Sequence, residues 1–384
     1  MSIRERAFDA PERMSYVNAL FIIGSLGTLI TPAVLDAWSR LNWSAGRLGL
    51  IAGIELAGLA LGSLTGLYWQ RRWNWRAVTM PSLIVGIAGN VTCLGTDSFL
   101  MICAARAAVG MAGGYLCGVY SAYTANIANP VRMIAITTFV QIALEALFLF
   151  FAPSLSHLGA GGIFMVMALL FAVLIPLIQW VPQRWPEGGE PQPGTQEHTR
   201  SWRGYPILLS FVPFVVVQTG VYTFLGQFGE AAANLNSDEA LRLVGISVIF
   251  SSLGSILAYG VDGRISLRGA IGGSVLVIGA TLAAALHAGN SSGAFLVSIS
   301  LLQIAWIFLN CMLYAALIQA NNLLVAAAST VSCLGASLGT TALGFMFERG
   351  GLAGALQLAI LSVVCTGILA LPFIRHGRVQ AAGS

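Results

Sequence analysis

The chain has 384 residues, of which 57% are hydrophobic and 9% are charged, and its formal net charge is +4. So few charged residues cannot cover the water-facing surface of a soluble protein, which excludes the soluble globular classes and indicates an integral membrane protein. The small positive charge reflects orientation in the membrane and contact with anionic lipid headgroups, and nothing in it suggests a nucleic-acid partner.

Apolar runs of about 20 residues, each long enough to cross a bilayer as a helix, recur along the chain. We predict an all-α protein with twelve such helices, near 15–37, 47–69, 77–96, 98–124, 133–153, 159–181, 205–228, 241–261, 269–288, 293–318, 323–346 and 351–374. The stretch from Pro182 to Arg203 is rich in Pro, Gly and charge, which is the composition of a linker. We therefore predict a six-helix bundle at 1–181, a linker at 182–204 and a second six-helix bundle at 205–384.

The two predicted bundles repeat each other at a constant offset. A set of small and basic residues in the first half recurs 192 positions later, with Gly53, Gly62, Ser63, Arg72 and Arg76 followed by Gly245, Gly254, Ser255, Arg264 and Arg268. This pattern indicates a parallel duplication, so that the fold consists of two parallel six-helix pseudo-repeats.

Arginine positions predict the orientation, because short loops rich in basic residues stay in the cytoplasm. The chain has no Lys, and with the N-terminus inside only Arg40, Arg47, Arg242 and Arg349 fall on the outer side. We expect a monomeric, multi-pass protein of the cell (inner) membrane, with both termini and the linker in the cytoplasm.

The loops after the second and eighth helices are basic: Arg72 and Arg76 lie in the first, and Asp262, Arg264 and Arg268 in the second. Twelve spans in two parallel halves with these loops resemble the major facilitator superfamily, and the resemblance covers the whole chain. The superfamily's loop pattern contains an Asp-Arg pair, and the first copy here lacks the Asp. The resemblance implies that these five residues form a cytoplasmic gate. The alternative is that the arginines only determine topology.

Three charged residues are predicted deep within helices of the first bundle: Glu55, Arg106 and Glu145. Arg106 begins RAAVGMAGG, which is similar to the superfamily's fourth-helix pattern, and a buried Arg usually faces the bundle interior or an aqueous cavity. One cation cannot neutralise two buried carboxylates, so we expect one of them to carry a proton. The alternative is a fixed ion-pair cluster.

Glu145 is the preferred proton carrier of the two glutamates. It shares a helix face with Thr137 and Gln141, and we expect this polar stripe to face the serines of the eighth helix. Glu55 instead adjoins a ridge of Gly58, Gly62 and Gly66, whose spacing suits static helix packing.

The tenth helix carries the clearest polar stripe, Gln303, Trp306, Asn310 and Tyr314, at spacings that return to one helix face. The superfamily resemblance places the solute cavity on helices 1, 4, 7 and 10. It therefore implies that this stripe binds substrate together with Arg106, Tyr120, Gln218 and Tyr222.

These features predict a secondary active transporter that moves a small organic solute by alternating access, coupled to protons. The leading substrate class is a monocarboxylate or aromatic acid docked on Arg106. The alternative is proton-driven efflux of neutral or cationic amphipathic compounds, in which Arg106 pairs with neighbouring carboxylates. A third alternative is a receptor or scaffold that does not transport a solute.

Several function classes lack their sequence signatures. The chain contains no HExxH and no GxxxxGK[ST], so we expect neither an enzyme nor a self-contained ATPase pump. Its six cysteines show no metal or disulfide spacing, so we expect no cofactor and no metal.

Overall fold

The structure is a computed structural model that describes residues 10–39, 41–69, 72–124, 127, 130–156, 161–183, 201–261, 264–286, 291–321 and 324–374. Its helices are α2 (Pro11–Leu29), α3 (Thr31–Ser39), α4 (Ala45–Trp69), α5 (Trp75–Gly95), α6 (Phe99–Thr124), α7 (Pro130–Ser156), α8 (Gly162–Leu174), α9 (Gly204–Ala233), α10 (Ser237–Gly260), α11 (Leu267–Leu286), α12 (Ser292–Asn321) and α13 (Val325–Ala370). Two short 3-10 helices, η1 (Ile175–Trp180) and η3 (Leu371–Phe373), follow α8 and α13.

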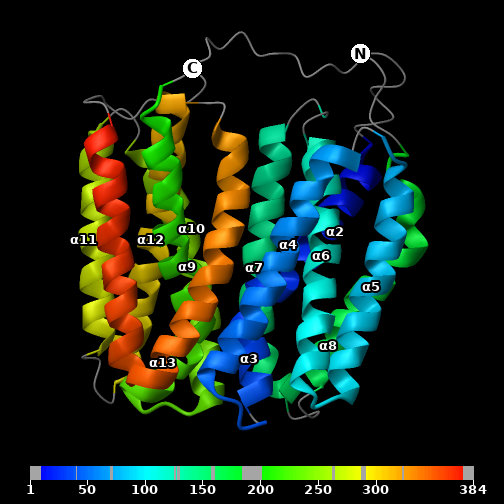
Figure 1. The fold of residues 1–384 in the computed structure, drawn as a ribbon, viewed down its shortest axis with the longest axis horizontal. Helices are drawn as coiled ribbons and strands as arrows, with labels where there is room; N and C mark the ends of the chain where they lie inside the picture. The colour runs from blue at the N-terminus through cyan, green and yellow to red at the C-terminus, as the bar shows by residue number, and fades with distance from the viewer. Residues whose placement is uncertain are drawn as a thin grey trace. The chain divides into compact units, whose positions relative to one another are not determined.

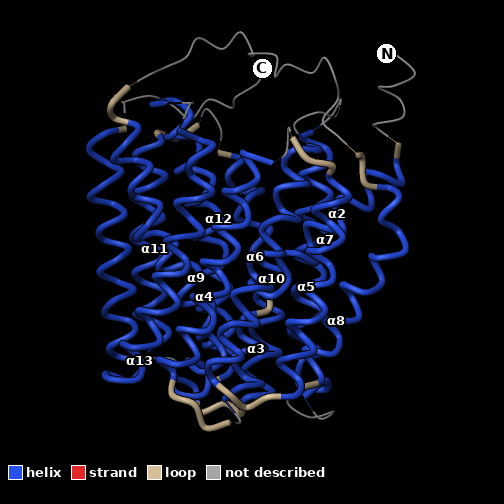
Figure 2. Tube along the Cα trace, turned by 45° about the vertical axis from the view of Figure 1, so that its right-hand side comes forward, coloured by secondary structure: helices blue, strands red, loops and turns tan. Residues whose placement is uncertain are grey.

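Within these described ranges the chain is helical and contains no strand (Figure 2). Among the described residues, ten helices are long and apolar enough to span a membrane, and the bent pair α2 and α3 makes an eleventh when it is counted as one span. The twelfth is the second half of α13, which breaks at Gly351. The predicted twelve-helix, multi-pass membrane fold is therefore confirmed.

The first predicted helix, 15–37, is in fact two helices bent by 45°. Pro32 lies at the bend and has no N–H, so it cannot donate to the carbonyl of Thr28 as a helical residue would. The Thr31 hydroxyl donates to that carbonyl instead, at 2.7 Å. A side chain thus replaces the missing backbone donor, which makes the bend tolerable inside a membrane.

The long helix α13 reverses direction at Gly351, where φ is 59° and ψ is −156°. This backbone conformation is essentially restricted to glycine. Figure 1 shows the reversal, with the orange helix turning back into the red one. The predicted spans 323–346 and 351–374 correspond to the two arms.

The chain forms two compact units, one comprising 1–37, 54–145 and 154–196 and the other comprising 38–53, 146–153 and 197–384. We call them unit 1 and unit 2. Helices α3, α4 and α7 contribute residues to both. The change falls after Ala37 in α3, after Gly53 in α4 and after Glu145 in α7, and α7 returns to unit 1 at Ser154. Residues 184–200 of the predicted linker lie outside the described residues, and the domain boundaries remain a prediction.

The repeat that the sequence indicates is visible in where helices begin. Helices α4 and α10 start at Ala45 and Ser237, and α5 and α11 start at Trp75 and Leu267, again 192 residues apart.

Both α5 and α10 carry an N-terminal asparagine cap: Asn74 accepts from the N–H of Arg76 at 2.9 Å, and Asn236 from that of Glu239 at 2.8 Å.

Candidate functional site

The most deeply buried charge in the described part of unit 1 is Arg106 on α6, whose side chain has no exposed surface. Its Nε donates to Oε2 of Glu55 on α4 at 2.9 Å, and its Nη2 donates to Oε1 of the same carboxylate. Its Nη1 donates to Oδ1 of Asn90 on α5 at 3.1 Å. The guanidinium therefore makes a two-point ion pair and a further hydrogen bond.

Glycines bring the two charges together. A Cβ on Gly58 would meet the backbone of Ala107, and a Cβ on Gly110 would meet the backbone of Glu55, so α4 and α6 touch through their main chains. A Cβ on Gly27 of α2 would collide with both Glu55 and Arg106. Glycines on α2, α4 and α6 thus leave the room that the ion pair occupies.

Phe164 on α8 completes this cluster, with its ring centroid 5.9 Å from the Arg106 Cζ. Gly27, Asn90 and Phe164 were not predicted from the sequence as members of this cluster. Asn90 could have been predicted from the sequence, because a single amide in an apolar spanning helix is costly unless it has a hydrogen-bond partner. The signal for Gly27 and Phe164 is absent from the sequence, since both act through the packing of distant helices.

The predicted proton carrier Glu145 lies half-buried on α7, at the end of the 54–145 segment of unit 1. Two turns before it, the Thr137 hydroxyl lies 2.5 Å from Oδ1 of Asn18 on α2 and accepts from the Tyr120 hydroxyl on α6 at 3.2 Å. The expectation that Thr137 faces the eighth predicted helix, which is α10 in the structure, is therefore wrong. Its partners are on α2 and α6, because at this level α7 packs within unit 1.

Contact between α7 and α10, the predicted eighth helix, occurs farther along α7. A Cβ on Gly245 of α10 would meet the backbone of Ala146 and Phe150, directly after Glu145. One of the α10 serines that were predicted to face this stripe is Ser247. Its hydroxyl bonds within its own helix and donates to the Val244 carbonyl at 2.7 Å. The α7–α10 contact is thus made by glycine and apolar residues.

Tyr120, a predicted substrate residue, is buried in unit 1. Beyond its bond to Thr137, its ring packs against Phe21 of α2 with centroids 4.3 Å apart. Asn18, Tyr120 and Thr137 therefore form a polar link between α2, α6 and α7.

Unit 2 brings the predicted α9 and α12 residues together. The Trp306 indole packs edge-on against Tyr222, with ring centroids 6.5 Å apart, and its Nε1 donates to Oε1 of Gln303 at 2.9 Å. Further along the same pair of helices, Tyr314 packs edge-on against Phe211 at 4.9 Å. Two ring pairs thus join α9 to α12 at two levels.

Two amides lie between these ring pairs along their helices. Asn310 is one turn from both Trp306 and Tyr314, and Gln218 is one turn from Tyr222, so each shares a face with the paired rings. Both are partly exposed, whereas Trp306 and Gln303 are buried. We call Gln218, Tyr222, Gln303, Trp306, Asn310 and Tyr314 the aromatic–amide face. It contains aromatic, hydroxyl and amide groups and no charged side chain.

The predicted gate arginines divide into two kinds. Arg76 and Arg268 donate to backbone carbonyls at the ends of η1 and η3, with Nε to Val181 at 2.8 Å and Nε to Ile374 at 2.7 Å. Arg72 and Arg264 are exposed, and Arg72 lies over the Tyr68 ring at 4.5 Å. Asp262 lies outside the described residues.

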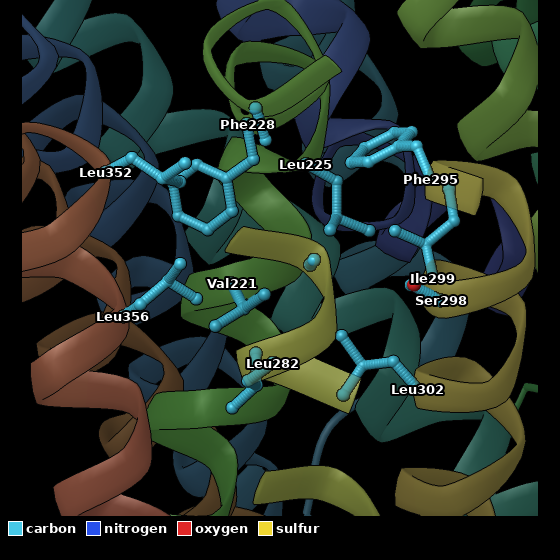
Figure 3. A pocket seen from close by; sticks show the side chains of 12 residues that line it. Val221, Leu225, Phe228, Leu282, Phe295, Ser298, Ile299, Leu302, Leu352 and Leu356 are labelled. Carbon is cyan, nitrogen blue, oxygen red and sulfur yellow. The ribbon is translucent and has the colours of Figure 1, made fainter. Parts of the chain in front are cut away.

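One small pocket in unit 2 lies between α9, α11, α12 and the second arm of α13 (Figure 3). Ser298, Leu282 and Leu356 line it, and they stand 192 positions after Arg106, Asn90 and Phe164. The Ser298 hydroxyl donates to the Ala294 carbonyl of its own helix at 2.9 Å. The charged cluster of the first repeat thus has an apolar counterpart in the second.

Residues 16–340 match the protein family described as Major Facilitator Superfamily. The chain belongs to the major facilitator superfamily. This assignment identifies it as a membrane transporter, and none of the curated proteins matches its sequence.

Solved structures of superfamily transporters share the fold. The xylose transporter XylE from E. coli, in a partially occluded inward-open conformation, has a TM-score of 0.74 and 14% sequence identity, covering 95% of this chain and 99% of that one. A mutant form of the nucleoside transporter NupG has a TM-score of 0.72 and 14% identity over 94% and 98%. A bacterial homolog of the human lysosomal transporter Spinster has a TM-score of 0.67 and 15% identity over 97% and 96%.

Proposed function

We propose that this chain is a proton-coupled secondary transporter that moves a small uncharged organic solute by alternating access. The observation that carries the solute class is the pairing of Arg106. Glu55 occupies two of its donors in a two-point ion pair, and Asn90 occupies a third. A carboxylate solute would have to displace Glu55 from a buried pair, which is costly because it leaves a second charge without a partner.

The aromatic–amide face supports the same solute class. Its amides and hydroxyls can pair with hydroxyl, carbonyl or ring-nitrogen groups, and its rings can cover an apolar face of the solute. A monocarboxylate finds no cation among these six residues. A cationic amphipath finds no carboxylate there either, and Glu55 is already neutralised by Arg106.

Two of the similar structures support uncharged polar solutes by analogy. One is named as a nucleoside transporter and another as a xylose transporter, and nucleosides and xylose are both uncharged. At 14% identity the likeness extends to this chain only as a general class. We therefore propose a solute of this type without choosing between the two.

Glu145 is the proposed proton carrier. Glu55 is held by Arg106 in a buried pair, whereas Glu145 is half-buried and lies where α7 passes from unit 1 to unit 2. A half-buried carboxylate in a spanning helix can exchange its proton as an alternating-access transporter changes conformation. A D-xylose–proton symporter is among the similar structures, which supports coupling to protons in this fold.

We further propose an inner-membrane location with both termini in the cytoplasm, and a monomer as the working unit. The support for orientation is the distribution of arginine. The gate role of Arg72 and Arg264 remains part of this proposal, because both are exposed at the ends of spanning helices. Asp262 would act with them.

Counterflow in reconstituted vesicles tests the proposal. Vesicles preloaded with a nucleoside, a pentose or a monocarboxylate would be given the same labelled solute outside at low concentration. We expect accumulation for an uncharged solute and none for the monocarboxylates. Accumulation of monocarboxylates alone would overturn the solute class, and no flux for any solute in a broad panel would overturn transport of a small organic solute.

A further inference from the structure

Gln303 on α12 combines deep burial with an unused hydrogen-bond donor. Its exposed fraction is 4%, and its Oε1 accepts from the Trp306 indole at 2.9 Å. Its Nε2 has no hydrogen-bond partner among the residues that the structure describes. Buried amide donors are almost always paired, so a donor left without a protein partner points to an external one.

Trp306 fixes which end of the amide is presented. An indole nitrogen only donates, so it must face the amide oxygen of Gln303, and the amide nitrogen must point away from Trp306. The indole is buried and packs edge-on against Tyr222, which holds it in place. The Gln303 amide is therefore prevented from turning over and offers two N–H donors.

The position of Gln303 connects this donor to the aromatic–amide face. It lies one turn before Trp306 on α12, and Asn310 follows one turn after, so all three share one side of the helix. A solute that contacts the Trp306 and Tyr222 rings would therefore lie within reach of the Gln303 nitrogen.

Resting on the transport function proposed above, we propose that Gln303 is a specificity-determining donor and that Trp306 is its positioning residue. The solute it selects presents a hydrogen-bond acceptor, a carbonyl oxygen, at this point of the site. An analogue with an amino group there is rejected, because two donors would then face each other.

The test uses Gln303→Met, which keeps the length of the side chain and removes the amide. The probes are uridine and cytidine, which carry a carbonyl and an amino group at the same ring position. They would be measured by thermal shift and by counterflow with the full-length protein. We expect wild type to favour uridine and Gln303→Met to weaken uridine about tenfold while changing cytidine little.

Two further variants sharpen the result. Trp306→Phe keeps a ring and removes the indole N–H, so the amide can turn over, and we expect the preference for uridine to fall. Gln319→Met removes an exposed amide from the same helix, and we expect it to behave as wild type in both assays.

The outcomes separate this inference from the transport proposal. If wild type moves uncharged solutes but Gln303→Met weakens uridine and cytidine equally, Gln303 has a packing or water-binding role and the inference fails alone. A wild-type preference for cytidine would also overturn it. If neither nucleoside binds and only pentoses move, the inference fails while transport stands; if nothing binds or moves, both fail.

Discussion

Arg76 and Arg268, 192 residues apart, make the same contact in their two repeats. Each lies in the first turn of its helix, α5 or α11, and donates from Nε to a carbonyl just beyond a 3-10 helix, at Val181 or Ile374. The last carbonyls of a helix have no partner within it, so an arginine supplies the missing donor. The duplicated loop therefore contains a duplicated helix cap, in addition to any role as a gate.

This contact predicts different effects for the two kinds of loop arginine. Arg76→Gln and Arg268→Gln should each destabilise the protein by about 1 to 2 kcal/mol, because each leaves carbonyl groups without a charged donor. Arg72→Gln and Arg264→Gln serve as matched controls, since both side chains are exposed. The apparent Tm in detergent measures the difference. Equal shifts for all four variants would contradict the capping role.

Much of the fold was predictable from the sequence because it depends on properties local to each segment. Hydrophobic length fixes the spans, and the constant offset of 192 reveals the repeat. The 45° bend between α2 and α3 was not predicted. Pro32 signals a bend, but whether a membrane helix tolerates it depends on a nearby hydroxyl such as Thr31.

The candidate site was less predictable because it depends on which helices touch. The sequence suggested Arg106 with either Glu55 or Glu145, and the choice between them rests on packing. The structure gives Arg106 a two-point pair with Glu55, at a place where Gly58 and Gly110 allow α4 and α6 to meet. No local pattern around Glu55 contains that information.

Gly351 offers a test of the helix reversal in α13. A Cβ would meet nothing within 4 Å at either Gly350 or Gly351, but only Gly351 has a positive φ, 59°. Gly351→Ala should therefore destabilise the protein by about 1 to 3 kcal/mol through backbone strain alone. Gly350→Ala is the matched control and should leave the apparent Tm nearly unchanged. Equal effects of both substitutions would contradict the assigned backbone conformation.

The Arg106–Glu55 pair should behave as a unit. Glu55→Gln leaves a buried guanidinium with no anion, and we expect a loss of about 3 to 5 kcal/mol of stability or failure to fold. The double variant Arg106→Gln with Glu55→Gln removes both charges and should recover much of that loss. Apparent Tm and yield of the monodisperse protein would measure the recovery. A double variant no better than Glu55→Gln would argue against mutual neutralisation.

Glu145→Gln tests proton coupling, because it keeps the shape of the side chain and removes its ability to release a proton. If Glu145 is the carrier, uptake driven by a pH gradient should be lost, whereas counterflow, which needs no net proton movement, should persist. Glu12→Gln is the control, since Glu12 is an exposed acid in the first turn of α2 and should retain both activities. Measuring both modes in the same vesicles separates coupling from solute binding. Loss of both modes would indicate a structural role for Glu145, and retention of both would assign the proton to another group.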